Sequence, residues 1–550
     1  MNYGRHYNIK VTPQSEKIPG SKQVANSAGG FSFAVDDWQR LQRFCILGSE
    51  GGSYYASEHK LSVENSEAVL RCIKQDGVRV VETVVSISDE GRAPKNDPAL
   101  FVLAMCAGLG DVTTRRIALG ALPKVARIGT HLFHFAEYVE GFRGWGRGLR
   151  NAISNWYLSK TPSQLALDVV KYQQRDGWSH RDLLRLAHPK AQDSLQNQVF
   201  HWVTQGEITE DVDTAFDVIY GFEKAKQARD AKEVVELIKF YNLPREAIPT
   251  QFLTDPKVWE ALLPTMPMTA MIRNLGNMSK VGLLRKGSWD VVKYVTDTLA
   301  DEEKLHRARI HPIGVLSALL TYQQGRGVRG KGEWEVVPDV VDALDEAFYK
   351  TFKFVEPTGK RIVLALDVSG SMGMGEIAGV PGLTPRMGSA AMAMVTYKTE
   401  KNVVIVAFAS GTQKTDQIFT FSIYYRQNDG IVPLDISRAQ RLDDVVRSVN
   451  SLPFGGTDCS LPMIWAAQNN IECDAIIVMT DSETWAGNIH PTQALDQYKQ
   501  KMGIDCKLCV VGMISNGFSI ADPDRNDMLD VVGFDTSTPN IVNQFIGGKI

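Results

Sequence analysis

The sequence is poor in several features that would place it in a particular class of protein. Only 7 of its 550 residues are cysteines, an odd and scattered number, which excludes a small secreted scaffold held together by disulfides. It has no apolar run of about 18 residues, so no membrane span is expected. The polar segment 1–20 lacks the apolar stretch of a signal peptide. We therefore expect reduced thiols and a cytoplasmic protein.

Familiar catalytic and zinc-binding patterns are also missing. Neither a Gly-x-Gly-x-x-Gly sequence nor a Walker-type phosphate loop occurs. Cys506 and Cys509 form a CxxC pair, but no second cysteine pair or histidine pair follows at zinc spacing. We interpret these cysteines as reduced thiols in a protein core.

Length and charge point to at least two unlike parts. A chain of 550 residues exceeds what one compact core usually takes, and 44% apolar with 22% charged residues is ordinary for globular protein. The formal net charge of −3 gives no hint of nucleic acid. It is an average, however, because residues 101–200 contain 13 Lys and Arg against 7 Asp and Glu, and the acidic excess lies beyond residue 355.

The first two-thirds of the chain is predicted to be helical. Apolar residues recur at helical spacing in 66–75, 97–107, 113–127 and 230–241. Such short helices follow one another with brief polar, glycine or proline joints. This succession favours stacked helix pairs, an α-helical solenoid, and an irregular bundle is the alternative.

From residue 356 the pattern changes to strands that alternate with helices. Continuous apolar runs are typical of buried parallel strands, and the alternation is typical of a doubly wound α/β sheet. We therefore predict two domains, 15–355 and 356–550. The predicted strands are 361–367, 402–408, 474–480 and 507–511, and the predicted helices are 387–398, 438–449, 461–468 and 492–501.

Three oxygen-rich motifs fall at strand ends or loops of this predicted sheet. Asp367, Ser369 and Ser371 form a DxSxS sequence, Thr457 lies in a later loop, and Asp481 ends another strand. Ligands of such sheets bind beyond the carboxyl ends of the strands. Because these are hard oxygen donors without sulfur or imidazole, they suit Mg²⁺. No His or Lys stands in these motifs as a base, so we expect binding rather than catalysis, and no enzyme. Ordinary loop capping is the alternative.

Basic residues gather in the segment 161–188. In a helix predicted over 162–176, Lys171 and Arg175 fall at i and i+4, and in the next helix Arg181, Arg185 and His188 again share one face. Like charges at this spacing cost roughly 0.2–0.5 kcal/mol per pair, so their repetition suggests an external anion. A solvated surface is the alternative.

The same region offers further candidate contacts to nucleic acid. His180 follows Ser179, which begins a sequence resembling a capping box. Upstream, Arg143, Arg147 and Arg150 alternate with glycine and a tryptophan. Guanidinium and aromatic groups can hold phosphates and stack unpaired bases. We count His180 and these three arginines among the candidate RNA-binding residues.

Longer segments resemble a known family. FCILGSEGGSYY (44–55), GWSHRDLLRLAH (177–188), MPMTAMIRNLGNM (266–278) and ARIHPIGVLS (308–317) are similar to parts of the TROVE module. The oxygen motifs resemble the metal-ion-dependent adhesion site of von Willebrand factor A domains. Together, over about residues 15–545, the chain resembles the Ro ribonucleoprotein autoantigen family.

The resemblance implies a monomeric ring of HEAT-like helical repeats closed by the A domain. Its central hole would take single-stranded ends of misfolded noncoding RNAs, and its basic outer surface would bind Y RNA. The resemblance to bacterial members leaves open a further expected partner, an exoribonuclease tethered through the Y RNA. At the metal site, Ser369, Ser371 and Thr457 would bind Mg²⁺ directly and Asp367 and Asp481 mostly through water, leaving one position for a partner's carboxylate.

By the same resemblance, the family's RNA-contacting positions fall on Lys171, Arg175 and His188, and helix geometry adds Arg181 and Arg185. The expected function is RNA binding in small-RNA stabilisation and RNA quality control. The alternative is a protein-interaction adaptor, in which a Mg²⁺-dependent A domain grips a partner's carboxylate and the helices act as a spacer.

Overall fold

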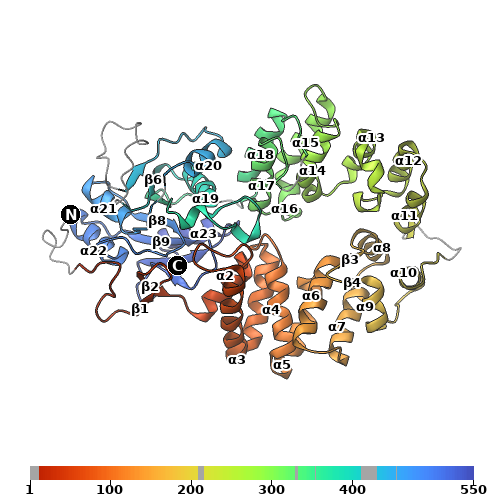
Figure 1. Cartoon of the computed structure of the whole chain (residues 1–550), viewed down its shortest axis with the longest axis horizontal. Helices are drawn as coiled ribbons and strands as arrows, with labels where there is room; N and C mark the ends of the chain where they lie inside the picture. Colours follow the sequence, from red (N-terminus) through yellow and green to blue (C-terminus); the bar gives the residue numbers. More distant parts are fainter. Residues whose placement is uncertain (1–10, 209–215, 329–331, 353–354, 411–429, 454) are drawn as a thin grey trace.

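A curved array of helices and a domain built on a central sheet make up the chain (Figure 1). The computed structural model describes residues 11–208, 216–328, 332–352, 355–410, 430–453 and 455–550. All seven cysteines are buried and free, as expected. None of the helices in the described segments is long and apolar enough to cross a membrane.

The helical array confirms the prediction of short helices that stack on their neighbours. Figure 1 shows two arms, one from α2 to α9 and one from α11 to α18. Within them α4 packs on α3, α5 and α6, and α17 packs on α14 and α18. The helices are α2 (Asp37–Leu47), α3 (Glu58–Glu90), α4 (Asp97–Leu109), α5 (Val112–Val125), α6 (Gly129–Phe142), α7 (Arg147–Leu158), α8 (Pro162–Lys171), α9 (His180–Ala187), α10 (Ser194–Gln205), α11 (Asp217–Gln227), α12 (Ala231–Tyr241), α13 (Pro256–Leu262), α14 (Met268–Lys280), α15 (Trp289–Ala300), α16 (Glu302–Arg307), α17 (Pro312–Gln323) and α18 (Pro338–Lys350).

One predicted helix is too long. The helix expected over 162–176 ends at Lys171, and β3 (Gln174–Arg175) then pairs antiparallel with β4 (Trp178–Ser179). Between the two strands, Asp176 and Gly177 have φ of 51° and 81°. Two successive residues with positive φ form the type I′ hairpin turn that Asp-Gly favours. The predicted shared face of Lys171 and Arg175 is therefore wrong.

The second domain has the predicted doubly wound sheet. Its strand order is β11-β9-β8-β5-β6-β7, parallel except for β7. Alternate residues of β5 enter two different apolar cores, so helices cover both faces. The strands are β5 (Arg361–Asp367), β6 (Asn402–Phe408), β7 (Ile431–Pro433), β8 (Ala475–Thr480), β9 (Lys507–Gly512) and β11 (Met528–Val532), and the helices are α19 (Pro385–Thr399), α20 (Leu442–Asn450), α21 (Leu461–Gln468), α22 (Pro491–Met502) and α23 (Thr538–Ile546). The predicted helix at 438–449 begins later, at Leu442.

The N-terminal residues belong physically to the sheet domain, although they were predicted within the helical one. β1 (Gln23–Ala25) pairs with β2 (Phe31–Ala34), which pairs with β10 (Phe518–Ser519). The Asn26 side chain also donates to the carbonyl of Thr484, 2.7 Å away. Segment 11–36 therefore forms a strap across the sheet domain before the first helix begins.

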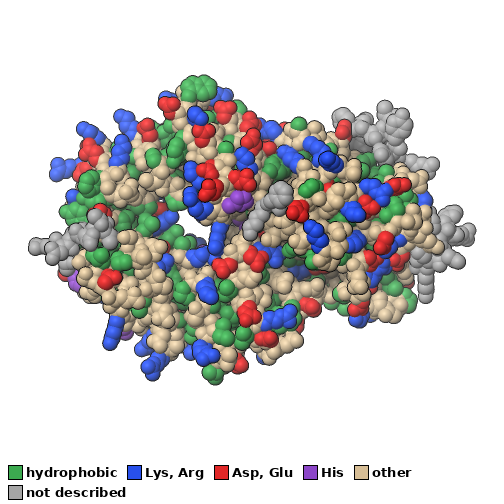
Figure 2. Space-filling model, turned by 180° about the vertical axis from the view of Figure 1, so that it is seen from behind, with side chains coloured by type: hydrophobic (Ala, Val, Ile, Leu, Met, Phe, Trp, Pro, Cys, Tyr) green, Lys and Arg blue, Asp and Glu red, His purple; other side chains and the backbone are tan. Residues whose placement is uncertain are grey.

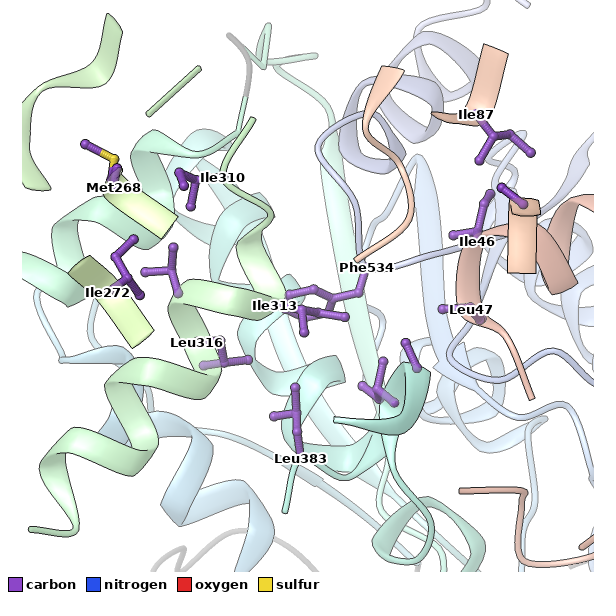
Figure 3. Close-up of a cluster of buried hydrophobic side chains, with 14 of the residues drawn as sticks. Ile46, Leu47, Ile87, Met268, Ile272, Ile310, Ile313, Leu316, Leu383 and Phe534 are labelled. Atoms are coloured by element: carbon purple, nitrogen blue, oxygen red, sulfur yellow. The ribbon is translucent and has the colours of Figure 1, made fainter. Parts of the chain in front are cut away.

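Both ends of the helical array rest on the sheet domain and share a core with it. In Figure 3, Ile46 and Leu47 of α2, Ile313 of α17 and Phe534 of the sheet domain approach one another. The Phe534 ring also lies 6.1 Å from that of Phe348 in α18. We call this shared cluster the junction. Because of it, the array returns on itself around a hollow, which has Lys and Arg side chains at its edge (Figure 2).

Ion pairs fasten each end of the array. At the α2 end, the buried Arg43 binds Asp530 at 2.6 Å and the carbonyl of Phe518 at 3.0 Å. At the α18 end, Arg441 binds Asp342 at 2.6 Å. In the first pair Arg43 is buried and only 10% of the Asp530 side chain is exposed, whereas the second pair is more exposed.

The Arg43→Ala variant tests this fastening. It leaves the Asp530 carboxylate without its cation in a buried place, a loss that typically costs about 3–5 kcal/mol. We expect a large drop in the urea midpoint of unfolding. The control is Lys22→Ala, which removes an exposed pair with Asp524 worth about 0–1 kcal/mol. Equal shifts in the two variants would contradict the account.

Candidate metal centre and nucleic-acid interface

The three oxygen motifs converge at the carboxyl edge of the sheet, as the sequence predicted. Asp367 ends β5 and Asp481 follows the neighbouring strand β8. The amide of Ser369 donates to Asp367 Oδ1 at 2.9 Å, and the hydroxyl of Thr480 donates to Asp367 Oδ2 at 2.6 Å. The Oγ atoms of Ser369 and Ser371 lie 3.2 Å apart. The whole set is buried.

The loop that carries Thr457 is tied to the first motif. The amide of Gly370 donates to the carbonyl of Gly455 at 3.1 Å. The amides of Trp485 and Ala486 both donate to the carbonyl of Thr457 at 3.0 Å. Backbone bonds thus hold this loop between the segments that follow β5 and β8.

Three buried carboxyl groups, Asp367, Asp481 and Glu483, gather at this site. Burial, followed by the charges of Asp367 and Glu483, raises the pKa of Asp481 to about 8. Burial also raises the pKa of Asp367 and raises that of Glu483 to about 7. Burial thus opposes the ionisation of all three carboxyl groups, and a bound cation would stabilise them as carboxylates.

Two residues at this site have no recognisable signal in the sequence. The buried Arg386, at the start of α19, donates to the carbonyls of Val368 and Ser369 at 2.5 and 2.9 Å and so supports the loop of the first motif. Glu483 lies two residues beyond Asp481 and accepts a hydrogen bond from the amide of Ser27 in the N-terminal strap. The positions of Arg386 and Glu483 at this site depend on contacts between segments that are far apart in the sequence.

The donor set fits Mg²⁺. In the described part of the chain, no three His, Cys, Asp or Glu side chains are grouped so as to hold a metal ion by themselves. Hydroxyl groups would therefore have to complete any site here, and the buried Ser369, Ser371 and Thr457 supply them. Hydroxyl and carboxylate oxygens are the ligands that this ion prefers.

Most of the predicted basic residues lie on the surface. Arg181 and Arg185 are exposed one turn apart on α9, and His188 is exposed in the left-handed conformation that ends this helix. Arg175 projects from the β3–β4 hairpin and has 61% of its side chain exposed. Lys171, at the end of α8, is half-buried beside the ring of Tyr172. The shared face expected for Arg181 and Arg185 is confirmed.

The upstream arginines differ from one another. Arg147 and Arg150 are exposed on the first turn of α7. Arg143 is half-buried and donates to the carbonyl of Ala107 at 2.8 Å. Its neighbour Trp145 packs 5.3 Å from Trp178 of the hairpin, so it links α7 to the hairpin.

His180 does not belong to this surface. It is only 2% exposed, its Nδ1 lies 2.9 Å from the Tyr157 hydroxyl, and its ring packs 4.7 Å from that of Phe133. Burial lowers the pKa of His180 to about 3. Its prediction as an RNA contact is corrected: it is a neutral core histidine.

A cavity of about 700 Å³ lies between the two arms and contains cations that sequence reasoning missed. Lys95 lines it from the first arm, and Arg273 and Arg309 line it from the second. The stacked rings of Tyr322 and Trp334, 6.1 Å apart, also border it. Only the packing of distant helices brings these residues together.

Comparisons with known proteins agree with this geometry. The family model "TROVE domain" matches residues 24–242 and 242–320, and "Ro60 vWA domain" matches 361–546. A Deinococcus radiodurans protein described as "RNA-binding protein RO60" is 43% identical over 550 residues, all of both chains. The chain belongs to the Ro60 family. Its helical array is thus a TROVE domain and its sheet domain a von Willebrand A domain.

Other members of the Ro60 family are similar over nearly the whole length. A Caenorhabditis elegans protein, also described as "RNA-binding protein RO60", is 37% identical over 620 residues, which cover 98% of this chain and 92% of that protein. The crystal structure of the Deinococcus radiodurans Ro (Rsr) protein matches with a TM-score of 0.70 at 43% identity, covering 94% of this chain and 100% of that one.

The His180→Gln variant tests the core role of His180. We expect a loss of about 1–3 kcal/mol in the free energy of unfolding, because packing and the bond to Tyr157 are lost. Its matched control, Arg181→Gln, is exposed and should change this energy by less than about 0.5 kcal/mol. Equal losses of unfolding free energy in the two variants would contradict the core role of His180.

The stability of the same two variants should also depend differently on pH. The folded pKa of about 3 is below the unfolded value of roughly 6.5, so the unfolded state binds the extra proton between these values. The contribution of His180 is therefore present above about pH 6.5 and is lost as pH falls toward 3. Urea titrations from pH 7 to pH 4.5 should show a shallower decline for His180→Gln than for Arg181→Gln.

Proposed function

We propose that this protein binds RNA, and that the exposed cations on α7, α9 and the β3–β4 hairpin, together with the half-buried Lys171 at the end of α8, form its outer RNA-binding surface. The observation that carries the proposal is the exposure of Arg181 and Arg185 on one face of α9, near Arg175 and His188. Such a surface suits the phosphates of a folded RNA such as Y RNA, since phosphate contacts supply most of the affinity. The relatives named as RNA-binding proteins support it.

Single-stranded RNA ends are proposed to enter the hollow between the arms. The cavity there combines Arg273, Arg309 and Lys95 with the aromatic rings of Tyr322 and Trp334. Cations that follow a backbone beside aromatic rings are typical of sites for unpaired strands. Misfolded noncoding RNAs with free single-stranded ends are the proposed substrates, which assigns the protein to small-RNA stabilisation and RNA quality control.

The A domain is proposed to bind Mg²⁺ through Ser369, Ser371 and Thr457, with Asp367 and Asp481 holding waters or orienting the hydroxyls. When bound, the ion supplies a positive charge that attracts a partner's carboxylate. No base accompanies this set, so we propose a binding role and no catalysis. An exoribonuclease tethered through Y RNA and a cytoplasmic location, which suits the reduced thiols, complete the proposal.

Filter binding of a Y RNA tests the outer surface. The Lys171→Gln, Arg175→Gln and His188→Gln substitutions, and separately Arg181→Gln with Arg185→Gln, should weaken binding. Each lost phosphate contact should also lower the slope of log affinity against log salt by roughly one unit. The control pair is Lys232→Gln with Lys239→Gln, exposed cations of α12 outside this surface.

Unchanged affinity and slope in the first two sets would reject the outer surface. If the α12 control lost as much affinity, any exposed cation would contribute equally to RNA binding. That result would also reject the outer surface.

The Asp367→Ala variant separates RNA binding from the adaptor alternative. Mg²⁺ binding, followed by calorimetry, should be lost because the carboxylate that orients Ser369 and Thr480 is gone. RNA affinity should not change, since the basic surface lies on the TROVE domain. If wild-type protein binds no RNA but Asp367→Ala loses a protein partner, the adaptor function replaces the one proposed.

A further inference from the structure

A second cavity adjoins the one between the two arms. It has a volume of about 380 Å³ and lies between α17, residues 326–328 and the A domain. Its border with the first cavity is formed by residues that line both, namely Ser317, Thr321, Gly327 and Pro381. A strand that lies in the first cavity would meet the second at this border.

The A domain contributes a wall to both cavities through segment 378–383, which we call the wall segment. Gly379, Val380 and Pro381 line the first cavity, and Pro381, Gly382 and Leu383 line the second. The wall segment lies between the DxSxS motif and α19, in a stretch where no sequence motif indicates a role. Its position makes the A domain part of the space proposed to receive RNA ends.

The wall segment is held in place by contacts on both sides. Ile377 and Leu383 are buried, and the amide of Ile377 donates to the carbonyl of Leu383 at 2.9 Å. Lys95 donates to the carbonyl of Gly379 at 3.1 Å, and Gly379 also lies against loop 48–57, which joins α2 to α3. The segment is thus a preformed surface and not a loose loop.

Two short antiparallel stretches of the TROVE domain bring a cation to the second cavity. The amide of Trp334 donates to the carbonyl of Gly325 at 2.8 Å, and Arg326 stands opposite Glu333. Arg326 is exposed and lines the cavity. Within the described residues no ion pair joins its guanidinium to Glu333 or to another carboxylate, so it is available to an anion.

The polar groups of the second cavity suit a nucleotide. Among the described residues that line it, Arg326 is the only charged one, and Ser317, Thr321 and Gln324 add hydroxyl and amide groups. A guanidinium binds phosphate, and hydroxyl and amide groups bind the hydroxyls of a ribose. Sites for small organic molecules have volumes of roughly 300–1,000 Å³, so a cavity of about 380 Å³ admits a nucleotide but no folded RNA.

We propose that the second cavity binds the terminal nucleotide of an RNA strand whose preceding nucleotides lie between the arms. The A domain thereby contacts RNA through the wall segment, and both domains share the site. This inference rests on the proposed entry of single-stranded ends into the hollow. It does not depend on a metal bound at the oxygen motifs.

Fluorescence anisotropy of a short, internally labelled oligouridine RNA tests the terminal site in the full-length protein. Arg326→Gln should weaken binding several-fold and lower the salt slope by roughly 0.7 for each lost phosphate contact of a single strand. Its control is Arg307→Gln, an exposed cation that lines neither cavity. Pro381→Glu puts a carboxylate on the shared border and should also weaken binding, whereas the matched Pro381→Gln should bind as wild type.

A biotin–streptavidin block at one end of the RNA shows whether the contact is terminal. When the entering end is blocked, wild type and Arg326→Gln should bind equally. When the opposite end is blocked, the difference between them should remain. Any other pattern overturns the terminal site, because Arg326 would then contact the interior of the strand or none of it.

The remaining outcomes separate this inference from the proposed function. Binding by Arg326→Gln and Pro381→Glu that equals wild type overturns the terminal site but leaves strand binding between the arms intact. Equal losses in Pro381→Glu and Pro381→Gln overturn the contact with the wall segment, since the charge would have no effect. If wild type binds no oligouridine, the entry of RNA ends fails together with the terminal site, and filter binding of Y RNA reports separately on the outer surface.

Discussion

The structure depends on the junction, where both ends of the TROVE array and the A domain bury one apolar cluster. A stack of helix pairs leaves apolar faces uncovered at its two ends, and terminal units need a cap. Here one A domain covers both ends: a β-carbon at Gly533 would lie 3.3 Å from Ile46 of α2, and the Phe534 ring lies beside Phe348 of α18. Leu383, from the segment after the metal motif, joins the same cluster. The array is therefore held as a closed circuit, and its two ends also touch directly: Arg309 pairs with Asp89 at 3.8 Å, and His311 Nε2 lies 3.1 Å from the carbonyl oxygen of Arg92.

Closure of the array keeps the sites of the two proposed functions apart. The exposed cations of α7, α9 and the hairpin lie in the first arm, away from the sheet, whereas the acidic metal motifs lie at the carboxyl edge of the A domain. The near-zero net charge of the whole chain averages these two parts. The junction and loop 48–57 are adjacent, since α2 supplies Ile46 to one and leads into the other.

Sequence patterns predicted correctly the features that depend on residues close together in the chain. The strands at 361–367 and 402–408 have the predicted limits, because long apolar β-branched runs lack helical periodicity, and helix starts follow their capping residues. Local patterns failed where long-range contacts decide. The sequence around His180 does not distinguish it from an exposed residue, but Tyr157 and Phe133 pack against its ring and bury it. The pairing of β2 with β10 joins residues nearly 500 positions apart, and Arg386 and Glu483 acquire their roles only through segments that meet in space.

Native-state hydrogen exchange in increasing urea, read by mass spectrometry, tests the central claim most directly. If the junction is one core, peptides from α2, α17 and β11 should open with the same free energy and the same dependence on urea, as one cooperative unit. Opening of α17 at much lower urea than α2 and β11 would contradict this, because the array would then be an open stack with one end resting loosely on the A domain.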